Sequence, residues 1–273
     1  MSKKLFACGI FIILFFTANF FNLSVVQAEE NIFLAAELKK QEGNKLQEQK
    51  DYQSAIEKYT EAIKLNPRFA WAYILRGNSY YSLGNFEKSI DDYTRAMQID
   101  YGIGEAFYNR GNAHRRLGNY EEAINDYSVA VQYFPKDPDV YGNRGVCRYI
   151  LENYEAAIED YTKAIEVDPN HVSSYYNRGM AYGDLKNYSK AFDDYNKAIL
   201  LDPNYSQAYN NRGLIHQKLK HYEQAIEDYT KAIKLDPNFA LAYNNRGIAY
   251  QALGKKSKAK ADFAKAKQLE SKK

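Results

Sequence analysis

The sequence predicts an all-α fold built from copies of one 34-residue repeat, and its internal periodicity is the first reason. The pentapeptide YNNRG occurs at 209–213 and again at 243–247, 34 residues later. Prolines recur at the same interval at Pro135, Pro169, Pro203 and Pro237. Self-similarity at a period of this length is the signature of a repeat architecture. With proline at position 32, seven repeats run to the last residue: 36–69, 70–103, 104–137, 138–171, 172–205, 206–239 and 240–273.

Small and aromatic residues occupy fixed columns of this frame. Position 8 is glycine and position 27 is alanine in all seven repeats, and position 24 is always tyrosine or phenylalanine. Small residues let two helices approach closely, and an aromatic ring fills the space beside them. Proline at position 32 ends the second helix because it cannot continue a helix. We therefore expect one packed helix pair per repeat.

These columns make the sequence resemble the tetratricopeptide repeat family, whose unit is a 34-residue helix–turn–helix. The resemblance covers residues 36–273 in seven in-register copies. It implies a right-handed superhelical solenoid whose first helices line a concave groove. It also implies a non-catalytic role as a scaffold or adaptor that binds another protein or a peptide in that groove.

The first 28 residues differ in character from the repeats. Lys3 and Lys4 precede an apolar run, and Ala28 ends a short motif of small residues followed by acids. This pattern is typical of a secretory signal peptide. An uncleaved membrane anchor over residues 5–26 is the alternative, because that stretch is long enough to span a bilayer. Either interpretation predicts a periplasmic, envelope-bound or secreted protein, with a short lead at 29–35 before the repeats.

Composition and motifs argue against several functional classes. A formal net charge of +3 gives no general attraction to nucleic acid. The sequence has no glycine-rich phosphate loop, no nucleophile elbow and no cysteine or histidine set with metal-ligand spacing. We therefore expect no enzymatic activity, no cofactor and no metal.

The asparagines at position 6 are candidates for ligand binding. Because a helix turns by about 100° per residue, positions 4, 8 and 11 share the packed face of the first helix. Positions 2, 6, 9 and 13 lie on the opposite face. Five repeats place an amide at position 6: Asn109, Asn143, Asn177, Asn211 and Asn245. An amide both donates and accepts, which suits the backbone of an extended peptide. Simple solvation of an exposed helix face is the alternative.

Position 9 adds an apolar stripe beside these asparagines. It is apolar in repeats 4 to 7, at Val146, Met180, Leu214 and Ile248. Tyr176 and Tyr149 offer further contact area. We expect an extended or helical peptide whose backbone meets the asparagines and whose apolar side chains meet this stripe. The alternative function is an accessory subunit of an envelope or secretion assembly that acts through its convex face or a membrane anchor.

Charges at positions 7 and 23 change sign together. Repeats 2 to 7 have arginine at 7 and aspartate at 23, as in the pairs Arg178 with Asp194 and Arg212 with Asp228. Repeat 1 has Glu42 at 7 and Lys58 at 23. Pairing within a repeat keeps opposite signs together throughout. The sequence therefore predicts structural ion pairs between the two helices of each repeat.

Overall fold

The computed structural model describes residue 27 and residues 30–271 of the 273-residue chain. The predicted signal peptide or anchor over residues 1–28 lies, apart from Gln27, outside the described residues. The described residues form helices joined by short turns and contain no strand, so the predicted all-α fold is confirmed. None of the helices in this part of the chain has the length and apolar character needed to span a bilayer.

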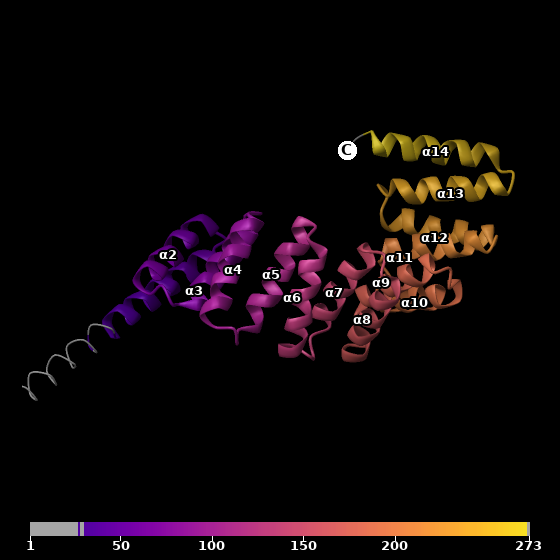
Figure 1. Ribbon diagram of the computed structural model, residues 1–273. Coiled ribbons are helices and arrows are strands. Elements are labelled where there is room, and N and C mark those ends of the chain that lie inside the picture. The colour runs from indigo at the N-terminus through magenta and orange to yellow at the C-terminus, as the bar shows by residue number, and fades with distance from the viewer. Residues whose placement is uncertain (1–26, 28–29, 272–273) are drawn as a thin grey trace, which may run out of the picture. The chain divides into compact units, whose positions relative to one another are not determined.

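The helices follow one another in the order that the repeat frame predicts (Figure 1). Residues 30–48 are helical, so the predicted lead at 29–35 is helical from residue 30 onward. The later helices are α2 (Tyr52–Leu65), α3 (Ala70–Ser82), α4 (Phe86–Ile99), α5 (Gly104–Leu117), α6 (Tyr120–Tyr133), α7 (Pro138–Ile150), α8 (Tyr154–Val167), α9 (Val172–Asp184), α10 (Tyr188–Leu201), α11 (Ser206–Lys218), α12 (Tyr222–Leu235), α13 (Ala240–Ala252) and α14 (Lys256–Glu270). From α3 onward, the first helix of each repeat begins at position 1 of the frame, as at Ala70, Pro138 and Ser206.

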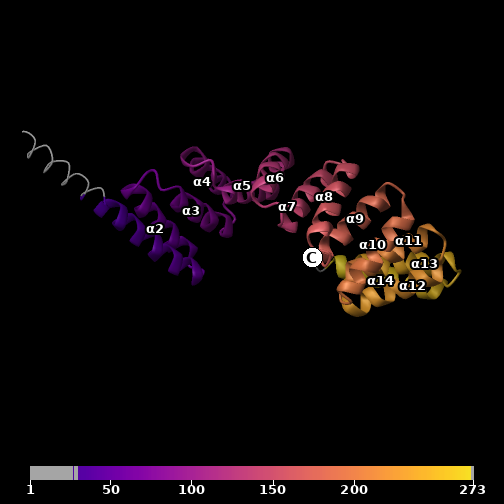
Figure 2. The ribbon, with the colours of Figure 1, turned by 90° about the horizontal axis from the view of Figure 1, so that it is seen from below.

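The structure divides into two compact parts between Gly118 and Asn119. The N-terminal part contains residues 30–48 and helices α2 to α5, and the C-terminal part contains α6 to α14. Within the C-terminal part each helix packs against the next one, from α6 and α7 through to α13 and α14 (Figure 2). Each part is therefore a stack of helices in which every helix contacts its sequence neighbours.

A left-handed residue forms the turn between the two helices of each repeat. Position 15 has a positive φ of 59–82° in all seven repeats, at Lys50, Gly84, Gly118, Glu152, Lys186, Lys220 and Gly254. This conformation ends the first helix. The next residue often caps the second helix: the side chains of Asp51, Asn85, Asn153 and Asn187 each accept a hydrogen bond from a backbone N–H three residues later.

Glycine at position 8 and the aromatic ring at position 24 hold the helix pair together. A Cβ atom built on Gly145 would lie 2.7 Å from Cε1 of Tyr161, closer than real side chains approach. Tyr161 is fully buried, and so are Ala157 and Ala164 on the same helix. Glycine is needed here because the tyrosine ring lies directly against the backbone of the first helix.

Candidate functional site

The arginine at position 7 binds the aspartate of its own repeat. Arg178 donates through Nε and Nη2 to the two carboxylate oxygens of Asp194, both at 2.8 Å. Arg212 makes the same bidentate contact with Asp228. In repeat 1 the reversed pair is present, with Lys58 Nζ 3.1 Å from Glu42 Oε2. The predicted pairs therefore exist within the repeat, and these arginines are engaged in structure.

Burial distinguishes the arginine pairs from the reversed pair. The side chain of Asp194 is 7% exposed and that of Arg178 is 17% exposed, whereas Glu42 is 47% exposed. The hydrogen bonds from Arg212 to Asp228 raise the pKa of the arginine, and burial acts against them. A buried aspartate left without its arginine would be an uncompensated charge, so each pair fixes the relative position of two helices.

The same arginines also bind the preceding repeat, which the sequence analysis missed. Nη1 of Arg178 donates to Oγ1 of Thr162 at 3.0 Å, and Nη1 of Arg212 donates to Oδ1 of Asn196 at 2.7 Å. The hydrogen bond recurs at position 25 throughout repeats 1 to 6, on Thr60, Thr94, Ser128, Thr162, Asn196 and Thr230. The sequence does contain a pattern that indicates this hydrogen bond. Position 25 has a hydroxyl or an amide in these six repeats, and it is alanine in repeat 7.

Asn109, Asn211 and Asn245, at position 6 of their repeats, bind the preceding first helix. Nδ2 of Asn109 donates to Oδ1 of Asn78 at 3.1 Å, and Nδ2 of Asn211 donates to Oη of Tyr176 at 3.0 Å. Nδ2 of Asn245 donates to Oδ1 of Asn210 at 3.0 Å, and Asn245 is only 6% exposed. The amides therefore connect consecutive repeats, a role that neither ligand contact nor solvation had anticipated.

The remaining predicted groove residues differ in exposure. Asn143 and Asn177 are half-buried, and so are Val146, Met180 and Leu214. Ile248 is 41% exposed. Tyr176, besides accepting from Asn211, packs its ring against Tyr195 and Tyr205 at centroid distances of 6.0 and 4.8 Å. Burial raises the pKa of Tyr176 above its usual value. Tyr176 therefore supports the asparagine rather than offering a free surface.

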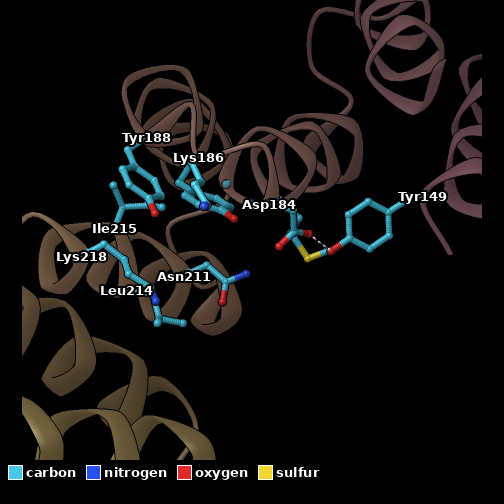
Figure 3. A pocket seen from close by; sticks show the side chains of 11 residues that line it. Tyr149, Asp184, Lys186, Tyr188, Asn211, Leu214, Ile215 and Lys218 are labelled. Atoms are coloured by element: carbon cyan, nitrogen blue, oxygen red, sulfur yellow. Dashed lines mark hydrogen bonds between the residues drawn. The ribbon is translucent and has the colours of Figure 1, made fainter. Parts of the chain in front are cut away.

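A hollow lies between the first helices of repeats 5 and 6, in the C-terminal part (Figure 3). It has a volume of about 350 Å³. Position 9 of each repeat contributes an apolar side chain, Met180 from α9 and Leu214 from α11. Asn211 and Ile215 complete the α11 wall. The hollow thus brings together three of the predicted groove residues, namely Asn211, Met180 and Leu214.

Equivalent hollows recur in the N-terminal part. One, of about 180 Å³, is lined by Asn78, Asn109 and Asn112 at positions 9, 6 and 9 of repeats 2 and 3. Another, of about 260 Å³, is lined by Asn44 and Leu75 at positions 9 and 6 of repeats 1 and 2. The predicted residues Val146, Asn143, Asn177, Asn245 and Ile248 line none of these three hollows. The face at positions 6 and 9 therefore forms discrete depressions.

The rim of the hollow in repeats 5 and 6 holds a tight polar contact. Oη of Tyr149, on α7, donates to Oδ2 of Asp184, on α9, at 2.6 Å (Figure 3). Burial, together with this bond to a carboxylate, raises the pKa of the Tyr149 hydroxyl above its usual value. Lys186 and Lys218 also line the hollow. Sequence analysis did not identify the lysines or Asp184, because position along a helix does not reveal which side chains converge from neighbouring repeats.

The helix pairs and their hollows define a helical-repeat protein, and family models say which kind. Tetratricopeptide repeat models match residues 70–100, 138–171, 172–205, 206–239 and 228–261, and a related repeat model matches 43–84 and 111–149. The chain belongs to the tetratricopeptide repeat family, as its repeat columns predicted. No curated protein matches the sequence.

Solved structures show the same fold. The chain is similar to YrrB, described as a TPR protein with an unusual peptide-binding site, with 25% identity over 67% of this chain and 95% of that one and a TM-score of 0.59. It is similar to MamA, with 29% identity over 59% and 95% of the two chains and a TM-score of 0.55. A repeat protein from Cytophaga hutchinsonii is 22% identical over 84% and 95%, with a TM-score of 0.70, and supports the fold alone. Membership of the tetratricopeptide repeat family supports a protein–protein interaction scaffold.

Proposed function

We propose that the protein is a non-catalytic scaffold that binds a peptide or an extended protein segment along the face formed by positions 6 and 9. The observation that carries this proposal is the recurrence of hollows at the same repeat positions in both compact parts. Within either part, such depressions suit the side chains of a bound segment. The similarity to YrrB, a TPR protein with an unusual peptide-binding site, also supports it.

The hollow of repeats 5 and 6 makes the strongest contribution to this proposal. It combines apolar surface from Met180 and Leu214 with the amide of Asn211. Ligand sites are mostly apolar with a few polar groups that fix orientation. A bound segment would bury the apolar stripe and exchange hydrogen bonds with the polar rim.

We place this activity outside the cytoplasm because the first 28 residues have the pattern of an export signal. N-terminal sequencing of the protein recovered from its native host tests this part separately. A mature chain that begins after Ala28 supports a cleaved signal. A chain that keeps residues 1–28 and stays with the membrane fraction supports the anchor. Recovery of the intact chain from the cytoplasm would contradict both.

A peptide-display selection tests the binding proposal. Peptides are selected on the wild-type protein, and their affinities are then measured for two variants. Leu214→Asp places a charge in the hollow, whereas Leu200→Asp changes a residue that is 72% exposed on α10, a second helix. We expect binding to weaken at least about tenfold with Leu214→Asp and to persist with Leu200→Asp.

The opposite pattern would favour the alternative of an accessory subunit that acts through its convex face or a membrane anchor. Thermal unfolding of both variants, followed by circular dichroism, establishes that each remains folded before the affinities are compared.

A further inference from the structure

The three recurring hollows differ in the charged side chains that line them. This difference indicates which charge a bound segment should have beside each hollow. Position 13 of the first repeat lines all three hollows and is Glu48, Ser82 and Asp184 in turn. In the hollow of repeats 5 and 6, position 13 of the second repeat is Lys218, and the turn residue Lys186 also lines it. Lysine is therefore confined to one of the three hollows.

The two lysines are not neutralised by ion pairs with the described residues. Lys186 and Lys218 are both exposed, and neither has a carboxylate within ion-pair distance among the residues that the structure describes. The one carboxylate in the lining, Asp184, already accepts a short hydrogen bond from Tyr149. The hollow therefore presents a net positive rim around an apolar floor of Met180, Leu214 and Ile215.

Lys186 has a backbone conformation that is unfavourable for residues other than glycine. It has a φ of 59°, in the left-handed region that disfavours residues with a Cβ atom. The equivalent residue is glycine in repeats 2, 3 and 7, at Gly84, Gly118 and Gly254. Lys50, Glu152 and Lys220 share this conformation, so Lys186 differs from them in lining a hollow.

We propose that this hollow recognises an acidic–apolar segment, in which one large apolar side chain enters the hollow and neighbouring aspartate or glutamate side chains lie between Lys186 and Lys218. The volume of about 350 Å³ is at the lower end of the range for ligand pockets, so it suits one or two side chains rather than a larger molecule. This inference rests on the proposed function, since it names the class of peptide that the same face binds.

Capped pentapeptides test the proposal, because acetyl and amide caps leave side-chain carboxylates as their only acids. The probes are Gly-Phe-Glu-Glu-Gly, its glutamine analogue Gly-Phe-Gln-Gln-Gly, and Gly-Ala-Glu-Glu-Gly, which lacks the apolar anchor. Affinities are measured for the full chain by chemical-shift titration. We expect the glutamine analogue to bind about three- to tenfold more weakly, and the alanine analogue to bind at least as weakly.

Variants then assign the effect to the two lysines. Lys186→Gln combined with Lys218→Gln should remove the preference for glutamate over glutamine. Lys220→Gln is the matched control, because Lys220 has the same left-handed turn position one repeat later and does not line the hollow. It should leave the preference unchanged.

The proposal is overturned by no detectable binding of the glutamate peptide, by equal binding of its glutamine analogue, or by a preference that survives the double lysine change. The display selection separates these failures from failure of the proposed function. If display-selected peptides depend on Leu214 but carry no acidic residue, the scaffold function stands and the acidic preference falls. If no selected peptide depends on Leu214, the scaffold function and the acidic preference are both contradicted.

The same glutamate peptide with a free C-terminus is a further probe. A gain in affinity would assign the lysines to a terminal carboxylate and overturn the side-chain assignment.

Discussion

Arg178 donates a hydrogen bond to Thr162 across the boundary between repeats 4 and 5, with Nη1 lying 3.0 Å from Oγ1. The same guanidinium holds Asp194 in its own repeat. One side chain thus fixes both the helix pair within a repeat and the stacking of that pair on its neighbour. The arginine column therefore contributes to the spacing of consecutive helix pairs.

Removing the hydroxyl alone should weaken the stacking. Thr162→Val keeps the side-chain shape and deletes the acceptor, so we expect a loss of about 1 kcal/mol in the free energy of unfolding. Chemical denaturation measures it. Ala264→Ser is the control at the same repeat position, where the described residues offer no following arginine, and it should change stability by less than about 0.5 kcal/mol. Equal effects of the two changes would show that the hydrogen bond to Arg178 is not responsible.

The buried ion pair should show strong coupling. Arg178→Ala leaves Asp194 buried without a partner, and we expect it to cost about 3–5 kcal/mol. In a double-mutant cycle with Asp194→Ala, the double variant should lose less stability than the sum of the single variants. Additive losses would contradict the pair. The same cycle on Glu42 and Lys58, whose side chains are 47% and 31% exposed, should show much weaker coupling.

Two glycines on first helices should respond oppositely to alanine. A Cβ atom at Gly213 would lie 2.8 Å from Cε1 of Tyr229, so Gly213→Ala should destabilise the protein by about 1–3 kcal/mol. At Gly183 the nearest atom would be Cδ1 of Ile215 at 3.9 Å, and Gly183→Ala should stabilise it by up to about 1 kcal/mol. Thermal or chemical unfolding measures both. A stable Gly213→Ala variant would mean that the tyrosine can move aside.

His216 should make stability depend on pH. Burial lowers its pKa below the ordinary value, and Nδ1 is buried without a hydrogen-bond partner among the described residues. The unfolded chain therefore takes up a proton at this position more readily than the folded one. Its contribution to stability is present above about pH 6.5 and is lost as the pH falls through the lowered folded pKa.

Denaturation curves between about pH 7.5 and pH 5 test this expectation. The wild-type protein should lose stability toward acid, and His216→Gln should show a shallower decline over the same range. An identical slope in the two proteins would exclude His216 as the cause.

Periodicity explains why much of the fold could be predicted. Gly145 and Tyr161 lie in columns that repeat unchanged, so their packing follows from the need for close helices. The pair of Glu42 and Lys58 was predictable because the two charges reverse together. These inferences all concern contacts within one repeat, where the separation along the chain fixes the geometry.

Contacts between repeats were harder to predict. Helical geometry gave the direction in which Asn245 points but not its distance to Asn210, so its burial and its hydrogen bond were missed. The column at position 25 was visible but had no assigned partner. Lys186 and Lys218 come from different elements, and only the stacked structure brings them to one hollow.

We propose that a bound segment occupies the hollow of repeats 5 and 6 on the first-helix face. The most direct measurement is methyl and backbone chemical-shift mapping of the protein during titration with a display-selected peptide. We expect the largest shifts at Met180, Leu214 and Ile215, with little change at Leu200. Shifts centred on Leu200 and the second helices, with Met180 and Leu214 unmoved, would contradict it.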